Sequence, residues 1–187
     1  MTSPRLAWRV PEGWRCFAAE ELATPGWRAA VPPAEPGSAY ETGLVRFEQW
    51  VAGQGASRVG WVLVLDPDPN TPGVVAFGSI DVRPGPDLDE LERQVADAAL
   101  PDHLVSRTLT RTRIAGRALL LCHELAARDD GPTGAHVEER GLAVRHLDSG
   151  LNVAVDLLTT DLAGFAEIAT TVGHACAAAD VTEEVAR

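Results

Sequence analysis

The sequence predicts an α+β fold in which an antiparallel β-sheet meander is flanked by α-helices. Four β-rich segments follow one another between residues 103 and 158, separated by short turn-forming stretches. Helical patterns precede and follow them, starting near Asp87 and Asp161. Strands joined by short turns pair as antiparallel neighbours, and packed helices must bury their apolar side. We therefore expect both helices to cover the apolar side of this meander.

Length and composition indicate a single α+β domain over residues 1–187. Hydrophobic residues make up 45% of the chain and charged residues 23%, which is ordinary for a globular protein with a substantial core. The sequence contains no internal repeat and no stretch of linker composition.

The first 38 residues are predicted to hold little regular structure. Leu6, Trp8 and Val10 stand at alternate positions and predict a short strand, closed by a Pro-Glu-Gly-Trp turn. Residues 15–38 contain many prolines and glycines, so we expect an irregular connection there. One short helix is predicted within it, near residues 18–22.

The next segment predicts a helix and a hairpin. Apolar residues at helical spacing from Tyr40 to Val51 predict an amphipathic helix. Residues 60–65 are too short and too β-rich for a helix, and they predict a buried strand. Residues 74–82 predict a second strand, which pairs with the first across a proline-rich loop.

In the second half, Asp87 is predicted to cap a helix, with Glu90 completing a capping box. Apolar and polar residues alternate in the last of the four strands, which indicates a sheet covered on one side and wetter on the other. A final helix is predicted from Asp161, and residues 180–187 are expected to form a frayed tail. The four predicted strands cover residues 103–114, 117–126, 137–147 and 151–158.

The charge disfavours nucleic acid and anionic membranes as partners. The net charge is -11, which repels phosphate groups, and all basic residues are arginines. The start of the chain lacks the apolar run of a signal peptide, and no stretch has the roughly 20 apolar residues of a membrane span. Three cysteines stand far apart in the sequence, without a CxxC pair. We expect a cytoplasmic protein with reduced thiols.

No sequence motif for catalysis, metal binding or a cofactor is present, so we expect no catalytic residues, no metal and no cofactor. The candidates for a ligand site or a hydrolase are His123, Glu124, His136 and Glu138. His123 and Glu124 are adjacent on a strand and point to opposite faces, so they cannot act together. We expect no cleft in which reactive groups converge.

Two groups of residues are candidates for binding a partner. Arg107, Arg111 and Arg113 share one face of a strand and could receive a carboxylate or a phosphate. The favoured alternative is an ordinary charged strand face, paired with the chain's own acids or protecting a sheet edge. Trp14 and Trp27 follow glycines in loop-like contexts, where they could pack at the edge of the core or face a partner.

Three short motifs stand at residues 9–14 (Arg-Val-Pro-Glu-Gly-Trp), 79–82 (Ser-Ile-Asp-Val) and 114–118 (Ile-Ala-Gly-Arg-Ala). They resemble motifs of the PsbP-like superfamily, and within it of the LpqN-type bacterial branch. The resemblance covers residues 5–15 and 74–178. It implies an antiparallel sheet flanked by helices and a non-enzymatic binding role, and it carries no catalytic residue over to this chain.

The sequence therefore favours a non-catalytic accessory or adaptor protein that binds a partner protein. One alternative is a small-ligand-binding protein or a hydrolase that uses the histidine and glutamate candidates. Another is a component or immunity factor of a secretion or toxin system. The sequence identifies neither the partner nor the oligomeric state.

Overall fold

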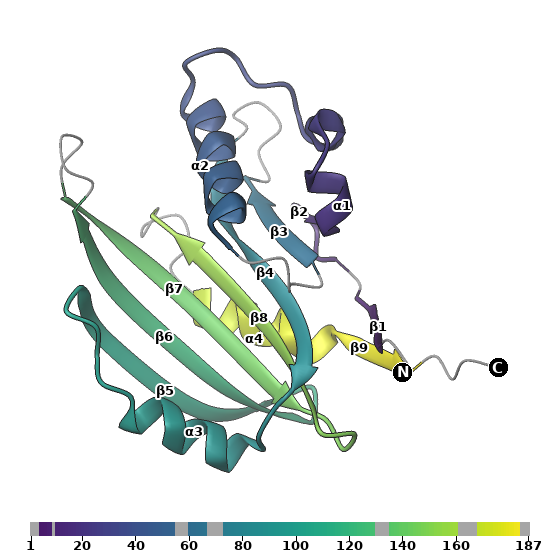
Figure 1. Cartoon of the computed structure of the whole chain (residues 1–187), viewed down its shortest axis with the longest axis vertical. Helices are drawn as coiled ribbons and strands as arrows, with labels where there is room; N and C mark the ends of the chain where they lie inside the picture. Colours follow the sequence, from purple (N-terminus) through teal and green to yellow (C-terminus); the bar gives the residue numbers. More distant parts are fainter. Residues whose placement is uncertain are drawn as a thin grey trace.

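The computed structural model describes residues 4–8, 10–54, 60–66, 73–129, 135–160 and 168–183. Figure 1 shows a long, twisted sheet with helices on both sides. The helices are α1 (Ala19–Leu22), the 3-10 helix η1 (Pro25–Ala30), α2 (Ala39–Gly53), α3 (Leu88–Asp97) and α4 (Ile168–Ala178). The strands are β1 (Pro4–Ala7), β2 (Trp14–Phe17), β3 (Gly60–Leu65), β4 (Val74–Pro84), β5 (Leu104–Ile114), β6 (Arg117–Asp129), β7 (Ala135–His146), β8 (Leu151–Thr159) and β9 (Asp180–Glu183).

Seven strands form one antiparallel sheet in the order β2-β3-β4-β8-β7-β6-β5. The predicted meander corresponds to β5 through β8, and the predicted hairpin corresponds to β3 and β4. The two parts join where β4 pairs with β8. The predicted α+β fold with an antiparallel sheet and flanking helices is therefore confirmed.

Helices α3 and α4 cover opposite faces of the sheet. Ala154 of β8 belongs to the apolar cluster that contains Leu88 of α3, whereas Val155 belongs to the cluster that contains Val172 of α4. Successive strand residues point to opposite faces, so the two helices must lie on different sides. The expectation that both helices cover one side is wrong, because β8 is buried on both faces over most of its length. We call the side covered by α3 the front face and the side covered by α4 the back face.

Helix α2 also packs on the front face, at the other end of the sheet from α3 (Figure 1). Its Phe47 is fully buried and lies against Phe77 of β4, with ring centroids 6.1 Å apart. Leu44 of α2 and Leu63 of β3 belong to the same cluster. Aromatic and aliphatic burial of this kind fixes α2 to the sheet.

Residues 15–38 are more ordered than predicted. The short helix near residues 18–22 is confirmed as α1, but β2 and η1 were not predicted. Strand β2 pairs with β3, and its Phe17 packs edge-on against Trp27 of η1 at 5.5 Å. The prolines and glycines correctly indicated turns. Strand β2 and helix η1 are too short to show a hydrophobic period in the sequence, so they could not be predicted from it.

The end of the described chain also differs from the prediction. Residues 180–183 form β9, which pairs antiparallel with β1, where a frayed tail was expected. The first strand is accordingly confined to Pro4–Ala7. Pairing of two four-residue strands rests on backbone hydrogen bonds, which leave little trace in hydrophobic periodicity.

Helix α3 begins at the predicted residue. Asp87 Oδ1 accepts hydrogen bonds from the backbone N–H groups of Asp89 at 3.0 Å and Glu90 at 2.9 Å. The predicted capping box is only half formed, because the Glu90 carboxylate binds Arg93 and Gln94 instead. None of the described helices is long and apolar enough to cross a membrane.

Two arginines hold the C-terminal end of α4. Arg117 Nη1 donates to the carbonyl oxygens of Ala177 at 2.6 Å and Ala179 at 3.2 Å, and Arg145 donates to the same two oxygens. These carbonyls lie at the negative end of the helix dipole, where cations are stabilising. The predicted start of this helix at Asp161 lies outside the described residues.

Candidate functional site

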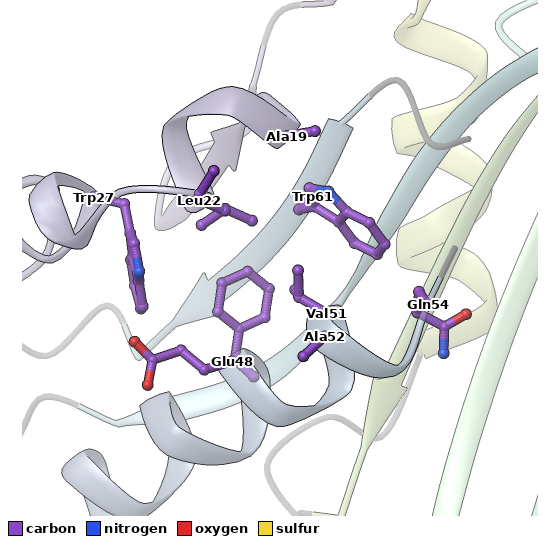
Figure 2. A pocket seen from close by; sticks show the side chains of 10 residues that line it. Ala19, Leu22, Trp27, Glu48, Val51, Ala52, Gln54 and Trp61 are labelled. Carbon is purple, nitrogen blue, oxygen red and sulfur yellow. The ribbon is translucent and has the colours of Figure 1, made fainter. Parts of the chain in front are cut away.

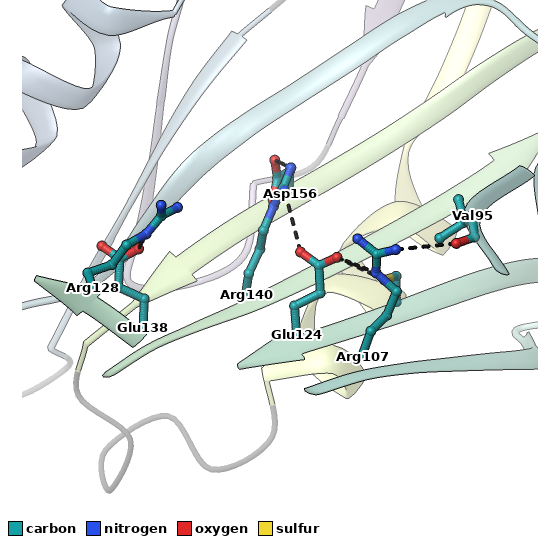
Figure 3. Close-up of polar contacts among 8 residues, drawn as sticks. Val95, Arg107, Glu124, Arg128, Glu138, Arg140 and Asp156 are labelled. Carbon is teal, nitrogen blue, oxygen red and sulfur yellow. Dashed lines mark hydrogen bonds and ion pairs between the residues drawn. The ribbon is translucent and has the colours of Figure 1, made fainter. Parts of the chain in front are cut away.

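The main candidate site is a polar groove on the front face of the sheet. Two cavities of about 440 and about 140 Å³ adjoin there and share four wall residues, Arg128, Glu138, Arg140 and Leu158. One end of the groove is formed by Trp50 and Gln54 at the end of α2, and the other by the segment that follows α3. The sheet is its floor, as Figure 3 shows from the strands that carry the charged side chains.

Four side chains of alternating charge cross this floor, one from each of β5, β6, β7 and β8. Arg107 Nε donates to Glu124 Oε1 at 2.7 Å, and Arg140 Nη1 lies 3.5 Å from Glu124 Oε2. Arg140 also donates through Nε and Nη2 to both carboxylate oxygens of Asp156, at 2.7 Å each. Hydrogen bonding to Asp156 raises the pKa of Arg140, although burial acts in the opposite direction. We call Arg107, Glu124, Arg140 and Asp156 the charge ladder (Figure 3).

The strand register sets these positions. Arg107 lies directly opposite Glu124, and Glu124 lies directly opposite Arg140. Asp156 is diagonal to Arg140 on the next strand, because Asp156 pairs with Leu142. Directly opposite and diagonal side chains on one face are within reach of each other when they are long.

A second ionic cluster surrounds Glu138 beside the ladder. Arg128 Nε donates to Glu138 Oε2 at 2.8 Å, and His136 Nε2 lies 3.3 Å from Oε1. Arg46 reaches from α2 to within 4.0 Å of Oε1, and its Nη1 donates to Thr160 Oγ1 at 3.0 Å. This arginine ties the helix wall of the groove to the floor.

Two of the three groove arginines are well exposed, whereas the third, Arg107, and the three carboxylates are largely buried. The side chains of Arg128 and Arg140 are 45% and 44% exposed, whereas those of Glu138, Glu124 and Asp156 are 13%, 14% and 8% exposed. An entering ligand therefore meets guanidinium groups first. The exposed charge in the groove is therefore positive, whereas the whole chain has a net charge of -11.

An apolar pocket of about 430 Å³ lies on the other side of the α2 terminus, between α1, η1, α2 and β3 (Figure 2). Its rim includes Glu48, whose carboxylate binds Arg28 through two hydrogen bonds of 3.1 and 2.8 Å. Its walls are Ala19, Leu22, Ala23, Trp27, Phe47, Glu48, Val51, Ala52, Gln54 and Trp61.

The polar groove and the apolar pocket meet at one residue. Gln54, which follows the last residue of α2, lines both. Trp50 lines the groove and Trp61 lines the pocket, and their rings meet edge to face with centroids 5.4 Å apart and planes at 90°. The two tryptophans form the partition between the two hollows.

The three arginines of the predicted stripe all bind groups of the chain itself. Arg107 belongs to the charge ladder and also donates to the Val95 carbonyl of α3 at 3.3 Å. Arg111 Nε donates to Glu92 at 2.9 Å, and its Nη2 contacts Asp89. Arg113 donates to the Gly116 carbonyl oxygen at 3.3 Å. The favoured alternative, pairing with the chain's own acids, therefore holds for Arg107 and Arg111, and β5 is an edge of the sheet.

Both candidate tryptophans are buried. Trp14 packs against Trp8 at 5.9 Å in the cluster beneath the back face. Trp27 packs against Phe47 at 5.6 Å and forms one wall of the apolar pocket. Their side chains thus serve the core, and Trp27 also shapes a surface hollow. A role of either residue in partner binding stays a prediction.

His123 and Glu124 point to opposite faces, as the strand geometry predicts, whereas Glu124, His136 and Glu138 share the front face. His123 lies on the back face, where its Nε2 is 2.6 Å from Glu139 Oε1. Glu124 lies in the charge ladder on the front face, and Glu138 and His136 lie in the neighbouring cluster. The expectation that ionisable groups do not converge is wrong, because three arginines and three carboxylates line the polar groove.

The nucleophilic side chains near the groove are not activated. Burial, together with the nearby Glu124 charge, raises the pKa of the Cys122 thiol to about 11, so it stays protonated at neutral pH. Ser79 lies opposite Asp156 on β4 and is buried, and its Oγ has no hydrogen-bond partner in the described part of the chain. Among the described residues, none is hydrogen-bonded to this hydroxyl as a base. Across the described residues, no three His, Cys, Asp or Glu side chains are grouped to hold a metal ion.

Sequence reasoning missed Arg128, Arg140 and Asp156. The sequence held one signal for them, which is that the charged groove residues of β6, β7 and β8 all have even residue numbers. These are Glu124, Arg128, Glu138, Arg140 and Asp156. Residues of the same parity within one strand share a face. Placing three strands on a common face also needed their mutual register, which parity alone does not supply.

Comparisons with known proteins give a distant structural relationship. No protein-family model and no curated protein matches the chain. Five chains of solved structures match it. One of them is LpqN of Mycobacterium tuberculosis, described as involved in cell envelope biogenesis; the TM-score is 0.46, the sequence identity 12%, and the match covers 97% of this chain and 85% of that one.

Proposed function

We propose that this protein is a non-catalytic accessory protein that binds an extended segment of a partner protein in the polar groove. The observation that carries the proposal is the exposure of Arg128 and Arg140 above carboxylates that are almost completely buried. Exposed guanidinium groups with unused N–H donors bind carboxylates and phosphates well. The groove is also long, since two cavities adjoin along the sheet, which suits an extended chain.

The state of the groove's reactive groups supports binding over catalysis. Each carboxylate of the charge ladder is hydrogen-bonded to an arginine, and none contacts an activated nucleophile. The raised pKa of Cys122 keeps its thiol in the unreactive form.

Differential affinity purification tests this function. Wild-type protein is compared with Arg128→Gln, and with Arg93→Gln as the matched control, because Arg93 is exposed on α3 and also pairs with one carboxylate. We expect a partner that the wild type and Arg93→Gln recover in equal amounts and Arg128→Gln recovers in clearly lower amounts. Equal recovery by all three proteins, or recovery of no partner, contradicts the proposal.

A small ligand is the second candidate. The larger cavity of the groove, about 440 Å³, falls within the roughly 300–1,000 Å³ of small-molecule sites. Native mass spectrometry of the purified protein distinguishes the two candidates. A small molecule that copurifies with the wild type and is lost in Arg128→Gln favours the ligand.

We also propose membership of the PsbP-like superfamily, in its LpqN-type branch, and a reducing, cytoplasmic location. The sequence motifs at residues 79–82 and 114–118 and the antiparallel sheet support the first proposal. Three cysteines without disulfide bonds support the second. A role in a secretion or toxin system stays a prediction.

A further inference from the structure

We infer that the bound segment carries an acidic side chain close to a bulky apolar one, the first held in the polar groove and the second in the apolar pocket. This inference rests on the proposed function and specifies its partner. Three observations carry it: the Arg128 donors that bind no described residue, the apolar lining of the pocket, and the continuity of the two hollows at Gln54.

The polar groove has donors left for an anion. Arg128 uses Nε for Glu138, and its two Nη atoms have no partner in the part of the chain that the structure describes. A guanidinium group can bind a carboxylate through two parallel N–H donors. Because the chain carries a net charge of -11, long-range attraction does not recruit an acidic partner. Direct contacts with Arg128 and Arg140 must select it.

The apolar pocket has room for one large side chain. Its cavity of about 430 Å³ is lined mainly by apolar groups, among them Leu22, Val51 and Trp61. Phe47 and Trp27 fix its shape, because both are buried and contact each other edge to face. A preformed pocket walled by fixed aromatic rings is a typical site for an apolar anchor residue.

Gln54 connects the two hollows. It lines both, and its amide supplies a donor and an acceptor at the point of contact. A peptide backbone that crosses from pocket to groove would pass this amide. One chain could therefore place an apolar side chain on one side of the Trp50–Trp61 partition and an acidic side chain on the other.

Defined peptides test the inference with the full-length protein. A fluorescent series contains one Glu and one Phe, separated by none to about four Gly or Ser residues, a range over which an extended linker spans increasing distances. Each peptide is compared with its Glu→Gln and Phe→Ser versions by fluorescence polarisation. We expect one spacing at which both replacements weaken binding about tenfold or more. Equal binding of the replaced peptides, or no binding at any spacing, overturns the inference.

Two matched pairs of variants assign the side chains to their sites. Ala52→Glu adds a charge at the wall of the apolar pocket, and Gln49→Glu adds the same charge on α2 outside both hollows. We expect Ala52→Glu to remove the preference for Phe and Arg128→Gln to remove the preference for Glu. Gln49→Glu and Arg93→Gln should keep both preferences, and loss of a preference in either control overturns the assignment. Thermal unfolding of each variant checks that it is folded.

Two further results separate the possible failures. If differential purification yields a partner that depends on Arg128 but the peptides show no preference, the inference fails and the proposed function stands. If light scattering shows a dimer that the best peptide dissociates, the occupant is a second copy of this chain, and the heterologous partner is overturned.

Discussion

Arg140 binds both carboxylate oxygens of Asp156 through parallel hydrogen bonds of 2.7 Å, which connect β7 to β8. The Asp156 side chain is 8% exposed, so its charge depends on this partner for solvation. Arg140 also faces Glu124 of β6. One guanidinium group thus compensates two buried carboxylates while keeping part of its surface in the groove.

Replacing Arg140 and Asp156 together should cost less stability than the sum of the two single replacements. For Arg140→Met we expect the free energy of unfolding to fall by about 2 kcal/mol, less than for a fully buried pair because the guanidinium is half exposed. The double variant Arg140→Met with Asp156→Leu should recover at least about 1 kcal/mol relative to the sum of the single effects. Urea unfolding measures both quantities, and additive effects would contradict this account of the pair.

Asp87 should make stability depend on acid pH. The N–H of Glu90, and to a lesser degree that of Asp89, lowers the pKa of this carboxyl below its ordinary value. A lowered pKa in the folded state gives stability that is present above the unfolded value of about 3.9 and is lost as the pH falls through the folded value. Asp87→Ala should therefore be less stable than wild type at neutral pH, with the difference shrinking in acid. Asp87→Asn, which keeps an acceptor oxygen, should be close to wild type and lack this pH dependence.

Gly78 should not tolerate a side chain. A Cβ atom at this position would lie 1.8 Å from the backbone oxygen of Asp156, so β4 and β8 would have to separate. We expect Gly78→Ala to cost about 3 kcal/mol or more, at the upper end of overpacking effects. Gly53→Ala is the control, because no atom lies within 4 Å of its added Cβ and alanine favours the helix. Comparable losses in the two variants would refute the proposed close approach.

The thiols should react slowly in the folded protein. Burial raises the pKa of Cys16 and Cys122 from 9.0 to about 11 and that of Cys176 to about 12. At neutral pH a shift of two pKa units lowers the thiolate fraction about a hundredfold. We expect iodoacetamide to label Cys16, the most accessible of the three, about a hundredfold more slowly in native protein than in urea. Mass spectrometry of the labelled peptides resolves each cysteine, and equal rates would contradict the prediction.

The positions of most helices and strands could be predicted from local sequence patterns. Which helix covers which face of the sheet could not. The hydrophobic period located α2, α3 and the strands of the meander, and turn residues separated them. Alternation in β8 indicated one wet face, but Asn152, Ala154 and Asp156 are buried by partners from elsewhere in the chain. Which helix covers which face depends on long-range packing, and residues near Leu88 and Ile168 give no local signal for it.

The candidate site was only partly visible in the sequence. Arg107 and Glu124 were both noticed, but as members of separate groups. Their pairing depends on the register of β5 against β6, and the addition of Arg140 depends on the register of β6 against β7. Register is set by turn geometry and by the whole apolar pattern of a sheet, so single residues do not reveal it.

The alternating charges of the ladder also bear on how the chain finds its fold. If β7 moved by two residues along β6, its apolar residues would still face the same side, but Glu124 would lie opposite Leu142 or Glu138 in place of Arg140. Such a misaligned sheet would take the second arginine away from Glu124, leaving it Arg107, or would set two like charges side by side. Arg140 therefore also disfavours misaligned pairings of β6 and β7 that hydrophobic burial alone would allow.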